Sequence, residues 1–166
     1  FNALVETKED ASEYGKLFDT ITLCFSKGLG CAFGSILTGK KNHLQKARRI
    51  RKVFGGGMRQ AGIMAAGCIY ALDNNINRLR QDHQLAKYIE QQLMLSNFVS
   101  DILPVETNII IFQLHDNIND KTFIDHLAQN DIHAFAIGDN WVRFVTHLDI
   151  NSDMAEHTRT VLAKMN

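Results

Sequence analysis

Apolar residues recur every three or four positions in several segments of the chain, which is the spacing of an amphipathic helix. In residues 41–54 the apolar positions include Leu44, Ile50 and Val53, and lysines and arginines fill most of the rest. Further helices are predicted at residues 58–72, 78–95, 120–129 and 152–165. The segment at 58–72 is apolar on most sides, so we expect it to be buried against several neighbours.

Short runs of β-branched and apolar residues between these helices predict strands. Two runs, residues 20–25 and 34–38, flank a turn at residues 26–30. Later strands are expected at residues 108–114, 134–137 and 141–146. Before all of these, the charged residues 7–17 are typical of a short helix or a loop.

The pattern changes between residues 97 and 105. Helices and a lysine-bearing strand turn come before this point, and strand, helix, two strands and helix follow it. We therefore expect an α/β chain of two parts. These are residues 1–97, with helices and short strands, and residues 98–166, a small α+β domain.

Composition excludes several function classes. The 166 residues include 18 Lys plus Arg and 18 Asp plus Glu, so no field of a single sign is present to hold nucleic acid or an anionic membrane. The longest uncharged apolar run, residues 61–72, is too short to cross a bilayer, and the first residues lack a signal-peptide pattern. We expect a soluble, cytoplasmic protein that binds neither nucleic acid nor membranes.

Cysteine and histidine spacing gives no sign of a metal site. Cys24, Cys31 and Cys68 match no zinc pattern, and we interpret them as free, reduced thiols. The seven histidines form no HxxxH pair and no His–Cys cluster on one element. A GxSxG motif and a local Cys–His signature are also missing, so a serine or thiol hydrolase has no support.

Lys27 is the first candidate for chemistry, because it follows an apolar strand run and precedes Gly28-Leu-Gly30. A lysine held between packed segments is partly desolvated, which lowers its pKa, and the neutral amine can attack a carbonyl to form a Schiff base. The alternative is an ordinary solvated lysine in a turn.

A second candidate is the glycine run Gly55-Gly-Gly57, which lies between two predicted helices and is flanked by Lys52 and Arg59. Free N–H groups at a helix N-terminus favour an anion such as phosphate. The alternative is a plain helix–helix turn with ordinary surface charges, since no Walker or GxGxxG pattern is present.

The third candidate is Arg143, which lies in the apolar run Trp141-Val-Arg-Phe-Val145. A guanidinium in such a strand needs a partner, and its planar fork suits the carboxylate of an amino acid. Alternation along the strand leaves another interpretation open, in which Arg143 reaches solvent.

Three segments that contain these candidates resemble one family. Residues 18–30, 48–62 and 142–149 are similar to the low-specificity L-threonine aldolases, and so is Pro104-Val-Glu-Thr-Asn108. These are pyridoxal 5'-phosphate (PLP) enzymes of fold type I, the aspartate-aminotransferase-like fold. The resemblance extends over nearly the whole chain and implies the C-terminal portion of such an enzyme, with part of its large domain and the small C-terminal domain.

The resemblance also implies a role for each candidate. Lys27, preceded by Ser26, would bind PLP through a Schiff base. Lys52 and Arg59 would approach the cofactor phosphate of a neighbouring subunit, so a homodimer or homotetramer is expected. Arg143 would hold the carboxylate of the amino-acid substrate.

The reaction implied is retro-aldol cleavage of L-threonine or L-allo-threonine to glycine and acetaldehyde. Two alternatives remain: another fold-type I PLP lyase, such as a β-eliminating lyase, and a non-catalytic fragment that only associates. In the family an Asp-Gly-Ala-Arg stretch would precede Phe1. We therefore expect a missing N-terminal segment of the same protein, and we expect the 166-residue chain by itself to be inactive.

Overall fold

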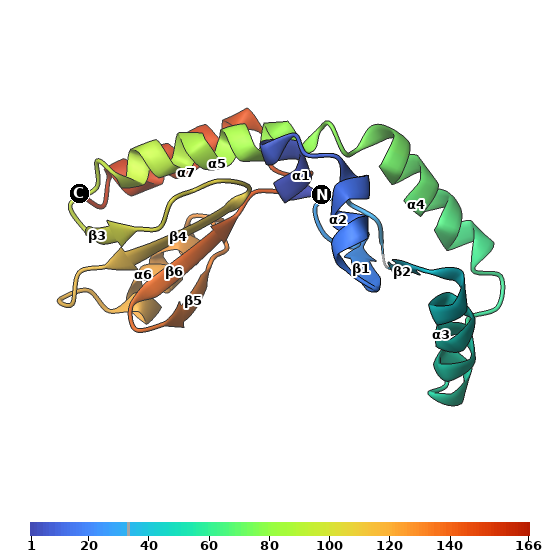
Figure 1. Cartoon of the computed structure of the whole chain (residues 1–166). Helices are drawn as coiled ribbons and strands as arrows, with labels where there is room; N and C mark the ends of the chain where they lie inside the picture. The colour runs from blue at the N-terminus through green and yellow to red at the C-terminus, as the bar shows by residue number, and fades with distance from the viewer. Residues whose placement is uncertain (33) are drawn as a thin grey trace. The chain divides into compact units, whose positions relative to one another are not determined.

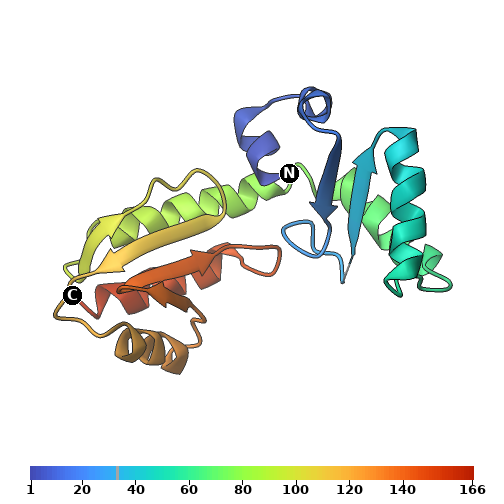
Figure 2. The ribbon, with the colours of Figure 1, turned by 60° about the horizontal axis from the view of Figure 1, so that its bottom comes forward.

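The computed structural model describes residues 1–32 and 34–166 and divides the chain into two compact units, residues 1–78 and 79–166 (Figure 1). The first unit holds a two-stranded antiparallel hairpin, in which Thr20 pairs with Gly39 and Cys24 with Ser35. Helix α3 packs beside β2 (Figure 2). Its elements are α1 Asn2–Thr7, α2 Ala11–Leu17, β1 Thr20–Cys24, β2 Ser35–Gly39, α3 Lys41–Val53 and α4 Gly62–Asn74.

Helix α4 is mostly exposed, although its sequence predicted that it would be buried. Only Ala71 is buried in it, while Ile63 is 79% exposed and Tyr70 is 64% exposed. The expected burial is therefore wrong for the described residues, because a two-stranded hairpin offers too little surface to cover a helix that is apolar on most sides. The helix also begins at Gly62 rather than at residue 58, since Gln60 has a φ of 51°, outside the helical region.

The second unit is a four-stranded antiparallel sheet of order β3-β4-β6-β5, with helices α5 and α7 side by side against one face (Figures 1 and 2). Side-chain caps fix the starts of two helices: Asn119 accepts from the backbone N–H of Thr122, and Asn151 from that of Met154. The elements are α5 Leu79–Leu93, β3 Val99–Ile102, β4 Ile109–Leu114, α6 Asp120–Gln129, β5 Phe135–Gly138, β6 Trp141–Val145 and α7 Ser152–Ala163.

The hydrophobic core lies in this second unit. Alternate residues of β4 and β6 point into it, and the ring of Phe112 stands 5.1 Å from that of Phe144 and 6.0 Å from that of Phe123 on α6. The opposite face of the sheet is far less covered, with Ile109 43% exposed and Phe135 64% exposed. The sheet therefore presents one packed face and one open face.

The division into units differs from the boundary expected after residue 97. Helix α5 belongs with the second unit because Ala86, Ile89 and Leu93 are buried in that unit's core. Most predicted helices and strands are confirmed to within a few residues. Helix α1 and strand β3 were not predicted, and residues 7–17 hold the end of α1 and all of α2.

Candidate active site

Lys27 lies in the loop between β1 and β2, which backbone hydrogen bonds hold in a defined shape. The N–H of Phe25 donates to the carbonyl of Gly34 at 3.0 Å, and the N–H of Cys31 donates to the carbonyl of Phe25 at 3.1 Å. A tighter turn starts at Lys27 itself, whose carbonyl accepts from the N–H of Gly30 at 2.9 Å. These hydrogen bonds therefore hold the loop backbone in place around Lys27.

The buried residues of the loop are the neighbours of Lys27 rather than Lys27 itself. Phe25 is 4% exposed and Leu29 is 2% exposed, whereas Ser26 and Lys27 are both exposed. The buried side chains of Phe25 and Leu29 therefore hold the turn on either side of Lys27. The described residues leave Lys27 exposed, so the packed surroundings expected from the sequence are not present among them.

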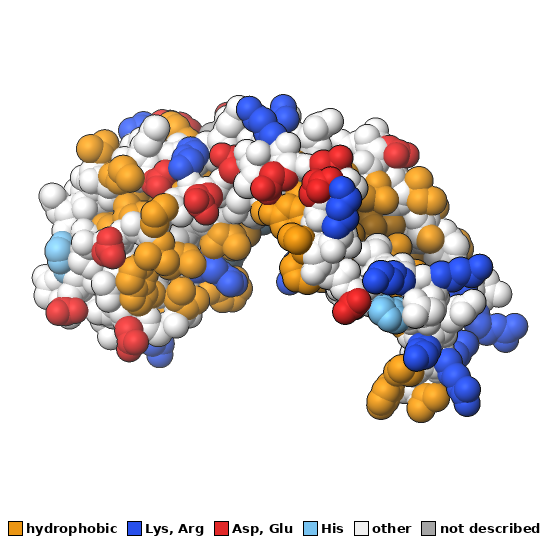
Figure 3. Space-filling view, viewed as in Figure 1, with side chains coloured by type: hydrophobic (Ala, Val, Ile, Leu, Met, Phe, Trp, Pro, Cys, Tyr) orange, Lys and Arg blue, Asp and Glu red, His pale blue; other side chains and the backbone are white. Residues whose placement is uncertain are grey.

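The glycine run follows α3, over which Lys and Arg side chains gather (Figure 3). Gly55 has a φ of 80°, which favours glycine, and the N–H of Gly56 donates to the carbonyl of Arg51 at 2.7 Å. The ammonium of Lys52 lies against Gly57 so closely that a Cβ there would collide with it. The Lys52 side chain therefore lies directly beside the glycine run.

The expectation of a helix N-terminus at the glycine run needs correction. Helix α4 begins at Gly62, and a turn at residues 59–61 separates it from the glycine run. The positive φ of Gln60 breaks the helical backbone there. Lys52 and Arg59 are both exposed, so the run is a cationic surface loop rather than the first turn of a helix.

Arg143 lies on β6, on the open face of the sheet. Its ladder partners are Ile111 of β4 and Phe135 of β5, and its guanidinium Cζ lies 5.8 Å from the centroid of the Phe135 ring. Within the described part of the chain, its Nε is buried and has no hydrogen-bond partner. In an arginine that points freely into solvent, the Nε–H would be hydrogen-bonded to water. The buried Nε–H of Arg143 is therefore suited to donate to an added anionic acceptor.

The structure brings some of the predicted residues together and leaves others separate. Ser26 and Lys27 share one loop, and Lys52 meets the glycine run. Arg143 belongs to the second unit, residues 79–166. Sequence reasoning missed Phe135, because its place opposite Arg143 follows from strand register, which no local pattern shows.

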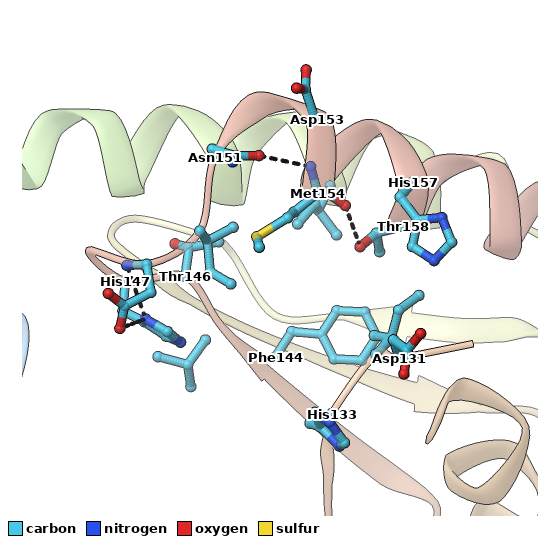
Figure 4. Close-up of a pocket in the computed structure, with 15 residues that line it drawn as sticks. Asp131, His133, Phe144, Thr146, His147, Asn151, Asp153, Met154, His157 and Thr158 are labelled. Atoms are coloured by element: carbon cyan, nitrogen blue, oxygen red, sulfur yellow. Dashed lines mark hydrogen bonds and ion pairs between the residues drawn. The ribbon is translucent and has the colours of Figure 1, made fainter. Parts of the chain in front are cut away.

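A separate cavity of about 670 Å³ lies in the second unit (Figure 4). Phe144 of β6 and Thr146, which follows the strand, line it, whereas Arg143 does not. His133 and His157 also line it, yet the described residues contain no group of three His, Cys, Asp or Glu that could hold a metal ion. The cavity therefore does not belong to the Arg143 site.

None of the helices that the structure describes is both long enough and apolar enough to cross a bilayer.

Comparison with known proteins gives a consistent relationship. The family model described as beta-eliminating lyase matches residues 1–117. The low-specificity L-threonine aldolase of Escherichia coli O157:H7 is 36% identical over 99% of this chain and 49% of its own length. A low-specificity L-threonine aldolase of Arabidopsis thaliana is 30% identical over 95% of this chain and 45% of its own length. The chain thus spans about half the length of the curated relatives it matches.

Solved structures agree on the fold. The threonine aldolase of Leishmania major superposes with a TM-score of 0.78 over 99% of this chain and 48% of that one, at 18% identity. The ornithine δ-aminotransferase of Plasmodium falciparum does so with a TM-score of 0.62 over 92% of this chain and 41% of that one, at 19% identity. These matches confirm the mixed helix-and-strand architecture expected from the sequence. Given the family match over residues 1–117, the chain belongs to the beta-eliminating lyase family, and its curated relatives include low-specificity L-threonine aldolases.

Proposed function

We propose that the protein carrying this chain is a PLP-dependent aldolase that cleaves L-threonine or L-allo-threonine to glycine and acetaldehyde. The observation that carries the proposal is the 36% identity to the Escherichia coli threonine aldolase over 99% of the chain. That match includes both the Lys27 loop and the Arg143 strand. A match confined to one unit would support the fold but not a shared reaction.

The described residues suit a phosphorylated aldehyde and an amino acid. The Lys27 amine is accessible at a pinned turn, as a group that bonds to an aldehyde must be. Lys52 and Arg59 are exposed cations beside a glycine run, which suits a phosphate. The Nε of Arg143, which has no hydrogen-bond partner among the described residues, suits a carboxylate. A related fold, the cystine C–S lyase C-DES, has been solved with glycine covalently linked to its PLP cofactor.

When bound, PLP would supply an electron sink for cleavage of the Cα–Cβ bond. The chain's own contribution is binding and orientation. Lys27 would hold the cofactor and release it to the substrate amine, and Arg143 would fix the substrate carboxylate so that the bond to be broken is correctly oriented.

The same proposal includes an assembly and a location. Lys52 and Arg59 are exposed in the described chain, and we infer that they complete the phosphate site of a neighbouring subunit in a homodimer or homotetramer. Three free thiols are consistent with the reducing cytoplasm, where we place the protein.

The test is to trap the lysine that binds PLP in the complete protein. PLP is added, the complex is reduced with borohydride, and the labelled tryptic peptide is identified by mass spectrometry. A label on Lys27, abolished by Lys27→Ala and kept in Lys40→Ala, is expected. A label on Lys40, Lys41 or Lys52 instead contradicts the assignment, whether or not the protein is active.

The name of the matched family favours a second candidate, a β-eliminating lyase. Schiff-base and carboxylate-binding residues do not determine which bond is broken. The products decide: glycine and acetaldehyde from threonine support the aldolase, whereas a keto acid and ammonia support β-elimination.

A further inference from the structure

Two cysteines of the first unit lie together although they are far apart in the sequence. Cys31 is in the loop that carries Lys27, and its thiol donates to the carbonyl of Gly67 at 3.6 Å, one residue before Cys68 on α4. The Cys68 thiol is also close enough to Cys31 to raise the pKa of Cys31. Three residues later in the same loop, a Cβ on Gly34 would lie 3.8 Å from Sγ of Cys68. The C-terminal part of the loop therefore approaches the Cys68 thiol.

Other contacts hold the loop on α4, so the meeting of the two sulfur atoms does not depend on the cysteines alone. The amide of Asn75, at the end of α4, donates to the carbonyl of Leu29 at 2.8 Å. Leu29 on the loop and Ala71 on α4 are both buried, at 2% and 1% exposed. A disulfide forms most readily where the backbone already brings the cysteines together.

The third cysteine provides an internal contrast. Cys24 is exposed on β1, whereas Cys31 and Cys68 are half-buried. Burial, and then the neighbouring Cys68 thiol, raises the pKa of Cys31 above its ordinary value. Cys31 is therefore a thiol near neutral pH.

We infer that Cys31 and Cys68 form an intrachain disulfide when the protein meets a small-molecule disulfide such as oxidised glutathione. In the first step, one cysteine loses its proton and attacks the reagent, so that a mixed disulfide forms and one small thiol leaves. In the second step, the other cysteine, also deprotonated, displaces the second small thiol. The two cysteine sulfurs are oxidised, and the reagent's S–S bond is reduced to two thiols.

The bond would tie the Lys27 loop covalently to α4. It would close the segment from residue 31 to residue 68, which contains β2, α3 and the glycine run with Lys52. Cross-linking a long segment restricts the unfolded chain, so the oxidised first unit should resist unfolding better than the reduced one.

Trypsin separates the three cysteines, which allows a direct test. Cleavage after Lys16, Lys27, Lys40, Arg59 and Arg78 places Cys24, Cys31 and Cys68 in three different peptides, residues 17–27, 28–40 and 60–78. The complete protein is reduced, transferred to oxidised or reduced glutathione, alkylated with iodoacetamide, digested and analysed by mass spectrometry.

The expected product after oxidised glutathione is peptide 28–40 joined to peptide 60–78, and both should be alkylated after reduced glutathione. Cys24→Ser should retain the joined peptides, and Cys68→Ser should abolish them. The inference is overturned if Cys31 and Cys68 carry only separate glutathione adducts or remain alkylated, or if Cys24 is the cysteine that forms the bridge. The result does not depend on PLP binding or aldolase activity.

Discussion

The guanidinium of Arg143 lies over the ring of Phe135, with its Cζ 5.8 Å from the ring centroid. The two residues are directly opposite each other in the β5–β6 ladder, so backbone pairing sets the contact. An aromatic face attracts a cation without using its N–H donors. Phe135 therefore restrains Arg143 while leaving its hydrogen-bonding groups available for a carboxylate.

Phe135→Leu in the complete protein should weaken substrate binding with little change in kcat. A cation–π contact at a partly exposed site is worth about 0.5–1 kcal/mol, which corresponds to a rise in KM of roughly two- to fivefold. Steady-state kinetics with threonine measure both constants. Phe135→Tyr retains the aromatic face and should behave like the wild type; if it matches Phe135→Leu, the ring does not act through the cation.

Arg143→Lys should lower kcat/KM for threonine while leaving PLP binding intact. A single ammonium cannot reproduce two parallel hydrogen bonds to a carboxylate, and the loss of a charged hydrogen bond costs about 1.5–3 kcal/mol, roughly ten- to a hundredfold. Kinetics and cofactor absorbance are measured on the same preparation. An equal loss of cofactor would show that Arg143 supports the fold or the PLP site instead.

Most helices and strands of the second unit could be predicted, because the hydrophobic pattern of each segment agrees with the way it packs. Helix α6 was predicted at its observed limits, and Asn119 caps its first turn. Strand β3 was not found because only its ends, Val99 and Ile102, are partly buried, and its register shifts between Val99 and Asp101. Helix α1 lacks a side-chain cap hydrogen bond at Phe1, so its start carries no sequence signal.

The candidate site could be predicted only in part. Lys27 was found because it follows an apolar run at a glycine turn, and Arg143 because it interrupts an apolar run; the family resemblance gave their roles. The contact of Arg143 with Phe135 and that of Cys31 with Cys68 depend on strand register and on the docking of a loop on α4. Both arise from tertiary structure, and neither follows from residue spacing.

Phe112→Ala should destabilise the second unit by about 3–5 kcal/mol, because it leaves a cavity where a large buried ring was. Phe112 is fully buried and contacts the rings of Phe123 and Phe144. Denaturant unfolding of the complete protein, followed by a probe in this unit, measures the change. Asp125→Ala, at an exposed position on α6, is the control and should change stability by no more than about 0.5 kcal/mol.

Acid should remove a stabilising contribution from Glu156. The Arg159 guanidinium and then the Tyr88 hydroxyl hydrogen-bond its carboxylate and lower its pKa from 4.5 to about 2. Because the folded-state pKa is the lower one, the contribution is complete above pH 4.5 and is lost as the pH falls towards 2. NMR titration should find the low pKa and a higher one in Arg159→Met; an unchanged pKa in that variant would contradict the cause.

Mixing two inactive variants should restore activity if Lys52 and Arg59 serve a neighbouring subunit. Lys27→Ala removes the lysine of its own site, and Arg59→Ala removes the cation given to the partner's site. In a mixed dimer one site then lacks both groups, while the other holds an intact Lys27 and receives an intact Arg59. Random pairing makes half of the dimers mixed, so about a quarter of wild-type activity is expected. If Arg59 instead acts within its own chain, every site in the mixed dimer lacks one group. Activity should then stay absent even when differently tagged copies are shown to have paired.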